Sequence, residues 1–197
     1  MLKKFFSFCF IILTGVVCGQ TQNQRDAAGR RQGYWEAIDS RGMPVYKGYF
    51  KDDKPFGKFT RYYPTGDVRI IMDYFDNTGV NARAQLFWSG SQTIAAQGIY
   101  INTLRDSVWL FYGQDGTLLS RVEYSKGKRN GKEQKFFPDG ITEAEEINWK
   151  DSIKHGPLKQ YFDNGQLKLM VTYINGSLEG QYISYYDDGQ KEIEGIY

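Results

Sequence analysis

A motif of 24 or 25 residues repeats through most of this 197-residue chain, and no other feature constrains the fold as strongly. The units start at seven positions: Gly33, Gly57, Ala82, Ser107, Gly131, Gly156 and Gly180. Self-similarity with a fixed period of this length is typical of repeat proteins, in which each unit packs mainly against its neighbours. The unit that starts at Ala82 fits the pattern least well.

Each unit carries the sequence signals of a hairpin turn. Nine residues after the start, six of the seven units have a glycine: Gly42, Gly66, Gly116, Gly140, Gly165 and Gly189. The preceding residues are turn formers, as in Pro138-Asp139 and Asp163-Asn164. Glycine adopts the left-handed backbone conformation that closes a short hairpin, so these positions are predicted to be turn glycines.

Aromatic side chains recur five residues after the start, again in six of the seven units. These positions are Tyr62, Phe87, Tyr112, Phe136, Tyr161 and Tyr185. We expect these rings to form a structural ladder along the stack and to belong mostly to its core. Each aromatic side chain can bury roughly 150–250 Å² of surface, which is a large stabilisation for so short a unit.

The second half of each unit alternates between apolar and polar residues. In the sixth unit Leu167, Leu169 and Val171 are predicted to lie on one face, with Lys168 and Thr172 on the other. This period of two indicates a half-buried strand, and no segment of useful length has a helical period. The sequence therefore predicts an all-β protein, a linear stack of about seven β-hairpins that form an elongated, twisted antiparallel sheet.

The repeat pattern resembles a known family. The motif consists, in order, of a glycine, an aromatic residue, a Tyr-Tyr pair, a turn glycine and a strand that ends in tyrosine. It is clearest in residues 57–74, 156–173 and 180–197. This pattern is similar to the bacterial variant of the MORN repeat, and the resemblance covers residues 33–197. The resemblance implies a protein-binding or scaffold role, and an antitoxin-like role as in proteins of the YwqK type. MORN repeats are also associated with membrane lipids. Ala84, Ser91 and Glu133 depart from the pattern.

The first nineteen residues are predicted to be a signal peptide. Lys3 and Lys4 precede an apolar run over residues 5–17, which is shorter than the roughly 20 residues that span a bilayer. Cleavage is expected before Gln20, and the alternative is an outer-membrane lipoprotein acylated at Cys18. Residues 20–32 have no large apolar side chain before the repeat begins, and we expect a disordered spacer there. The protein is thus expected to be periplasmic or extracellular.

Charge and cysteine content narrow the function classes further. Lysine and arginine total 25 and the acids total 23, so removal of Lys3 and Lys4 would leave a net charge of zero. This balance gives no support to nucleic-acid binding. Both cysteines, Cys9 and Cys18, lie in the predicted signal peptide, so the mature chain is expected to have neither a disulfide nor a thiol nucleophile.

No constellation of residues predicts catalysis, a cofactor or a metal. The single histidine, His155, is expected in a solvated loop between units, where a catalytic triad is unsupported. Asp52-Asp53 and Asp187-Asp188 are interpreted as turn formers, and the segment 126–129 as a basic loop. Glu143, Glu145 and Glu146 form one acidic cluster, in which two carboxylates on one face are a conceivable acid and base, but a solvated face is the simpler interpretation.

Two functions remain open from the sequence. The first is a non-catalytic, exported protein-binding or scaffold module of the bacterial cell envelope, with an antitoxin or immunity role as a special case. The second is a surface protein that contacts lipids or glycans. In both hypotheses the chain is not an enzyme and requires no cofactor, and in the first its partner is another protein.

Overall fold

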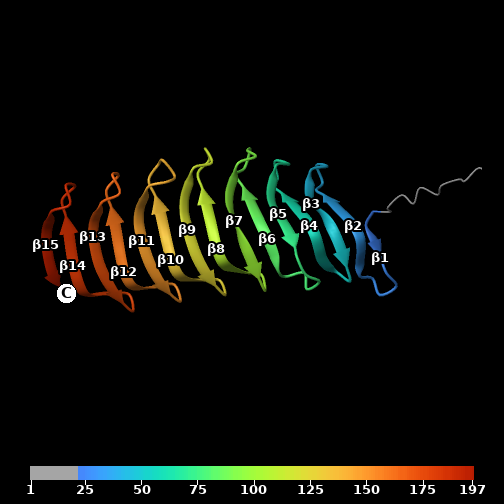
Figure 1. Ribbon diagram of the computed structural model, residues 1–197. Coiled ribbons are helices and arrows are strands. Elements are labelled where there is room, and N and C mark those ends of the chain that lie inside the picture. Colours follow the sequence, from blue (N-terminus) through green and yellow to red (C-terminus); the bar gives the residue numbers. More distant parts are fainter. Residues whose placement is uncertain (1–21) are drawn as a thin grey trace, which may run out of the picture.

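The computed structural model describes residues 22–197, which form one open antiparallel sheet (Figure 1). Within this range there are fifteen strands, and their order in the sheet is their order in the sequence. Seven hairpins follow a short first strand, so the prediction of an all-β stack of hairpin repeats is confirmed. Residues 1–19, the predicted signal peptide with Cys18, lie outside the described residues. No helix in the described range is long and apolar enough to cross a membrane.

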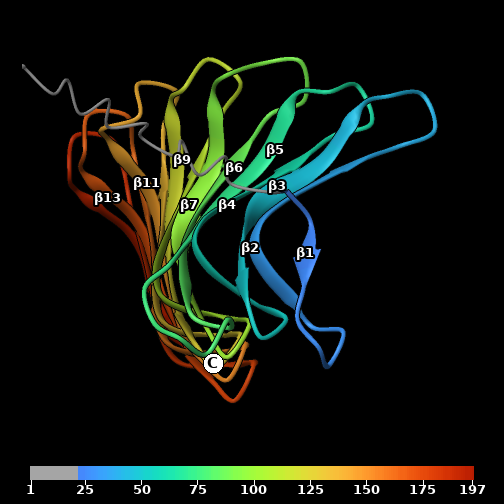
Figure 2. The same ribbon diagram turned by 90° about the vertical axis from the view of Figure 1, so that its right-hand side faces the viewer.

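The strand bounds follow the repeat. They are β1 Gln24–Arg25, β2 Arg31–Ile38, β3 Pro44–Lys51, β4 Lys54–Tyr62, β5 Val68–Tyr74, β6 Ala82–Phe87, β7 Ile94–Ile101, β8 Leu104–Tyr112, β9 Leu118–Ser125, β10 Lys128–Phe136, β11 Glu143–Lys150, β12 Ile153–Tyr161, β13 Leu167–Ile174, β14 Ser177–Tyr185 and β15 Lys191–Ile196. Each hairpin is bent, so the sheet curves when it is viewed along the stack (Figure 2).

Turn chemistry closes the hairpins. The six predicted turn glycines all have positive φ, from 69° at Gly140 to 91° at Gly66. In the fifth unit the Asp139 carboxylate accepts hydrogen bonds from the backbone N–H groups of Ile141 and Thr142, at 2.9 Å each. The third unit lacks a glycine at Ser91, and Gly90 has the positive φ instead, at 72°.

Two-residue turns connect most of the units, and both residues of each such turn have positive φ. This geometry matches the right-handed twist of the flanking strands. It also explains two differences from the sequence analysis. Because Asp151 and Ser152 complete one turn, His155 already lies in β12 and not in a loop. Because Lys126 and Gly127 complete another, only the first half of the predicted basic loop is a loop, and Lys128 begins β10.

Every hairpin contains a bulge at its turn end, and this bulge changes which residues share a face. In the sixth unit Gln160 pairs with Leu169 and Tyr161 with Leu167, so Lys168 is an extra residue. Lys168 lies with Gln160 and Leu169, and its Nζ is 5.4 Å from the centre of the Phe162 ring. The prediction that Leu167 and Leu169 share a face opposite Lys168 is therefore wrong, because simple alternation ignores the inserted residue.

The most buried side chains form a row two residues after the unit start, on what we call the core face. Phe59, Trp109 and Leu158 belong to this row, and Trp109 is fully buried. Trp109 lies over Gly98 of the neighbouring strand β7, and its indole N–H donates to the carbonyl oxygen of Ile99 at 3.1 Å. Since a single-layer sheet has no second layer to cover it, large rings lying over glycine supply this burial.

The six predicted ladder aromatics lie three residues further along each unit and are half-buried. Tyr62 is on the opposite face from Phe59, with the Lys47 Nζ 5.7 Å from the centre of its ring. The hydroxyl of Tyr112 accepts a hydrogen bond from the Gln97 amide at 2.8 Å. The fully buried row is therefore not the row expected from the aromatic periodicity.

Residues 22–32 have a defined backbone, which differs from the disordered spacer expected there. The strand β1 pairs with the start of β2. Asp26 accepts hydrogen bonds from the backbone N–H groups of Ala28 and Arg30, at 2.9 and 3.0 Å. The Arg25 guanidinium lies 5.1 Å from the centre of the Trp35 ring. Polar and cation–π contacts thus order a segment that has no large apolar residue.

Candidate functional site: a groove over the second and third units

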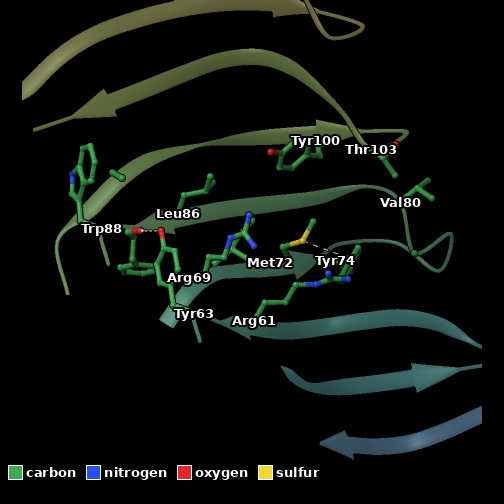
Figure 3. A pocket seen from close by; sticks show the side chains of 14 residues that line it. Arg61, Tyr63, Arg69, Met72, Tyr74, Val80, Leu86, Trp88, Tyr100 and Thr103 are labelled. Carbon is green, nitrogen blue, oxygen red and sulfur yellow. Dashed lines mark hydrogen bonds between the residues drawn. The ribbon is translucent and has the colours of Figure 1, made fainter. Parts of the chain in front are cut away.

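The strands β4 to β7 and their loops form a groove of about 540 Å³ on the core face (Figure 3). Its lining consists of Arg61, Tyr63, Arg69, Ile70, Met72, Tyr74, Gly79, Val80, Leu86, Phe87, Trp88, Ala95, Tyr100 and Thr103. The groove follows the strand direction, from Trp88 at one end to Val80 and Thr103 at the other (Figure 3). Its volume lies in the range of ligand sites in proteins.

The third unit has a small residue at a core position beside the groove, although Ala84 itself does not line it. Ala84 occupies the position that Phe59 and Trp109 occupy in the flanking units. The groove is also bounded by the longest connection between units in residues 22–197, seven residues between β5 and β6. Asp76 holds this loop by accepting hydrogen bonds from the Thr78 backbone N–H, at 3.0 Å, and the Asn81 side-chain amide, at 2.5 Å.

A missing cation leaves the groove aromatics uncovered. Four units have an arginine or lysine two residues before the start, lying over an aromatic ring later in the unit: Arg31 over Phe50, Arg105 over Tyr124, Arg129 over Trp149 and Lys154 over Tyr173. The second and third units have Pro55 and Val80 there instead. Their aromatics, Tyr74 and Tyr100, line the groove.

Two arginines from neighbouring strands contribute the charge of the groove. Arg61 pairs with Ile70, while Arg69 is the extra residue of the hairpin bulge, so both side chains reach the groove face. Among residues 22–197 neither arginine lies within 4.0 Å of a carboxylate oxygen. Their nearest aromatic contacts are loose, 5.8 Å from Arg61 to the Phe59 ring centre and 5.9 Å from Arg69 to that of Tyr63.

The polar groups at the two ends of the groove differ in their partners. The Tyr63 hydroxyl donates to the carbonyl oxygen of Phe87 at 2.9 Å (Figure 3). The indole N–H of Trp88 is buried, with no hydrogen-bond partner within the described chain. Burial raises the pKa of Tyr74, although the charge of Arg61 opposes the shift, so Tyr74 is a neutral hydrogen-bond donor at neutral pH. The groove therefore offers two cations and an apolar floor.

The predicted acidic cluster is divided between the two faces. Lys132 donates to Glu146 at 2.8 Å and Lys135 donates to Glu145 at 2.7 Å, while Gln134 donates to Glu143 at 3.2 Å. Burial alone would raise the pKa of Glu145, but hydrogen bonds from Gln160 and Lys135 hold it below its ordinary value. These carboxylates are used in ion pairs and hydrogen bonds across strands, an arrangement that fits sheet stabilisation.

The other residues considered in the sequence analysis as catalytic or metal-binding candidates make structural contacts or lie in turns. The Nδ1 atom of His155 accepts a hydrogen bond from the Asn175 backbone N–H at 3.4 Å. Asp52-Asp53 and Asp187-Asp188 lie in turns. Within residues 22–197, no group of three or more histidine, cysteine or acidic side chains is placed to hold a metal ion.

Sequence reasoning missed most of the groove. Of the residues it singled out as repeat-ladder positions, only Phe87 lines it. Simple alternation assigned Arg69 to the face opposite Ile70, whereas the bulge brings both to the groove. The available signal was the irregularity of the third unit at Ala82, Ala84 and Ser91, together with the missing cation at Val80.

Comparison with protein families finds the repeat in three places. The family model described as MORN repeat variant matches residues 57–77, 154–175 and 178–197. These matches coincide with the second, sixth and seventh units, and the third unit is not among them. MORN repeats are often protein- or membrane-binding modules. A comparison with curated proteins finds no match.

Proposed function

We propose that this chain is a non-catalytic repeat scaffold of the bacterial cell envelope that binds another protein through the groove over its second and third units. An antitoxin or immunity role is a special case of this function. The observation that carries the proposal is a recess of about 540 Å³ in which Arg61 and Arg69, neither of them in an ion pair within residues 22–197, lie beside a half-buried apolar floor.

The surroundings of the ionisable groups support a binding role over catalysis. The best acid–base candidates, Glu145 and Glu146, are each within 2.8 Å of a lysine Nζ. Hydrogen bonds from Gln160 and Lys135 lower the pKa of Glu145, whereas a general acid needs a raised pKa. His155, the one histidine of the chain, lies in β12, far along the sheet from the groove.

A lipid-contacting role is the alternative, and one observation favours it. Leu104 and Ile153 lie beside the two-residue turns and are about half exposed, at 46% and 50%. Lys126 and Lys128 belong to the same edge of the sheet. Apolar and basic side chains at one edge suit a membrane surface. However, Leu104 packs against Gly127 and Ile153 against Gly176 of neighbouring turns, which explains their presence without a membrane.

Affinity capture from an envelope extract separates the two functions. Purified protein on a resin is expected to retain one protein species in stoichiometric amount, and the pair should elute together in size-exclusion chromatography. The same protein should not sediment with liposomes that contain acidic phospholipids, nor bind a glycan array above background. Sedimentation with liposomes, in the absence of any stoichiometric protein partner, would replace the proposed function with the lipid-contacting one.

A further inference from the structure

We propose that the groove over the second and third units binds an extended acidic segment of a partner protein, with a carboxylate held between Arg61 and Arg69. This inference rests on the proposed function, because it assumes that the partner is a protein. It adds the chemical class of the bound segment and the residues that select it.

The charge of the groove calls for an anion. Arg61 and Arg69 lie on one face of the neighbouring strands β4 and β5, because Arg61 pairs with Ile70 and Arg69 is the bulge residue next to it. Neither arginine has a carboxylate partner in residues 22–197. Five arginines of this part of the chain are in ion pairs, and Arg25, Arg83 and Arg105, which are not, lie within 5.3 Å of an aromatic ring centre, closer than Arg61 or Arg69. The planar guanidinium group matches a carboxylate with two parallel hydrogen bonds.

The floor of the groove calls for an apolar neighbour beside that carboxylate. Ile70, Leu86 and Tyr100 pack against the buried cluster around Trp109 and are themselves only half-buried. An aliphatic or aromatic side chain of the ligand would cover them and exclude water from the arginines. Exclusion of water strengthens the charge-assisted hydrogen bonds. An inorganic anion or a highly hydrated sugar acid would leave this surface exposed.

The length of the groove matches an extended peptide segment. Trp88 lies at one end of the groove and Val80 and Thr103 at the other (Figure 3). The strand residues that line it on β5 run from Arg69 to Tyr74, a span that an extended peptide of about five residues would match at roughly 3.3 Å per residue.

The shape of the site favours a protein segment over a membrane. The two arginines reach a recess that lies along the strands, and aromatic side chains form its walls (Figure 3). A flat bilayer surface reaches protruding side chains more readily than a recess. The exposed Leu104 and Ile153, which would suit a membrane, belong to the turn edge and are not among the groove residues.

Binding of hexapeptides to the purified full-length protein tests the inference. The probe set carries two glutamates flanked by leucine or phenylalanine, and matched sets carry glutamine or lysine in place of the glutamates. Fluorescence anisotropy should give an affinity at least about tenfold higher for the glutamate peptides than for the glutamine peptides. The double variant Arg61→Gln, Arg69→Gln should lose this preference, and Arg61→Glu, Arg69→Glu should prefer the lysine peptides.

Arg83→Gln is the matched control. Arg83 is exposed, is in no ion pair within residues 22–197 and lies on the opposite face of the sheet, 5.3 Å from the centre of the Phe75 ring. This variant should bind the glutamate peptides within about twofold of the parent protein. Far-UV circular dichroism checks that every variant keeps its strand content.

The outcomes separate this inference from the proposed function. Equal binding of glutamate and glutamine peptides, or no binding of either, overturns the acidic-segment inference. It is also overturned if acidic vesicles bind through Arg61 and Arg69 and displace the peptides. If the double glutamine variant still captures the stoichiometric partner from an envelope extract, the scaffold function stands and the groove is not its binding site. If neither the parent protein nor any variant captures a partner, the proposed function itself is contradicted, and the acidic-segment inference falls with it.

Discussion

Glycines in this protein serve two distinct purposes at the scale of single residues. At five of the seven unit starts, glycine has a positive φ, for example 58° at Gly57 and 102° at Gly156. At Gly98 the φ is not in the left-handed region, and the need is for space, since a methyl group there would overlap the Trp109 ring. The sequence pattern revealed the first purpose but not the second, because the repeat frame says nothing of which ring covers which strand.

Ser107 is the unit start at which a side chain takes the glycine conformation, with a φ of 58°. We expect Ser107→Gly to raise the free energy of unfolding by about 0.5–1 kcal/mol. Removing the strain of a left-handed non-glycine residue stabilises the folded state by roughly 1–2 kcal/mol. The greater conformational freedom of glycine in the unfolded chain lowers this gain by about 0.5–1 kcal/mol. Urea unfolding measures the change. The control is Ser120→Gly, because Ser120 lies in β9 without a positive φ, and it should lower stability.

Gly98→Ala should destabilise the protein by about 1–3 kcal/mol, the usual cost of overpacking a core position. The cause is steric, because the new methyl group would collide with the fully buried Trp109. Gly195→Ala is the matched control: Gly195 occupies the equivalent register position opposite Tyr182 and has no atom within 4 Å of its Cβ direction. It should change stability by less than about 0.5 kcal/mol. Equal effects in thermal unfolding would contradict the ring-over-glycine packing.

At the scale of elements, the hairpin bulge is the feature that sequence reasoning could not place. The period and the turn glycines identified the hairpins, including the difficult third one, because these signals are local. The position of the bulge is set by the pairing between the two strands, which the sequence pattern does not show. The predicted assignment of residues to faces was therefore wrong by one residue at the start of each second strand. That single residue decides that Arg69 lines the groove and that Lys168 lies beside Leu169.

The edge element β1 should loosen at low pH. Hydrogen bonds, first among them that from the Arg30 backbone N–H, lower the pKa of Asp26 from 3.8 to about 2. A depressed carboxyl pKa stabilises the folded edge above pH 4, and this contribution is lost as the pH falls from 4 through about 2. Amide exchange at Ala28 and Arg30 should therefore accelerate between pH 4 and 2, after correction for intrinsic rates. In Asp26→Asn the same amides should exchange faster already at pH 6, with a weaker pH dependence.

At the scale of the whole molecule, stability should be distributed locally along the stack. Each strand pairs only with its sequence neighbours, and the two buried clusters around Trp109 and Leu158 involve separate sets of strands. Such an array behaves approximately as a sum of unit and interface terms. The seven-unit architecture was predictable from the period, whereas the groove was not, because it arises from side chains that four strands and their loops bring together.

Leu158→Ala should reveal this locality. The substitution removes a buried side chain from the cluster with Ile147 and Val171, at a cost of about 2–5 kcal/mol. Hydrogen exchange should accelerate from β11 to β14, while β4 and β5 keep their protection. Tyr161→Ala should cost less, because Tyr161 is half-buried, and Lys168→Ala less than about 1 kcal/mol. A uniform loss of protection from β2 to β15 would indicate one cooperative core and would contradict the linear array.

The sequential strand order also determines how the molecule responds to tension. If its two ends are pulled apart, the load falls on the outermost hydrogen-bonded pair, and the strands separate like a zipper, one hairpin after another. No strand in the described sheet is clamped between distant parts of the chain, so no pair has to yield by shear. Each hairpin of 24 or 25 residues would release about 80–90 Å of chain at roughly 3.3–3.6 Å per residue. Under tension the sheet is therefore expected to lengthen in regular steps and to shorten again as the hairpins refold one at a time.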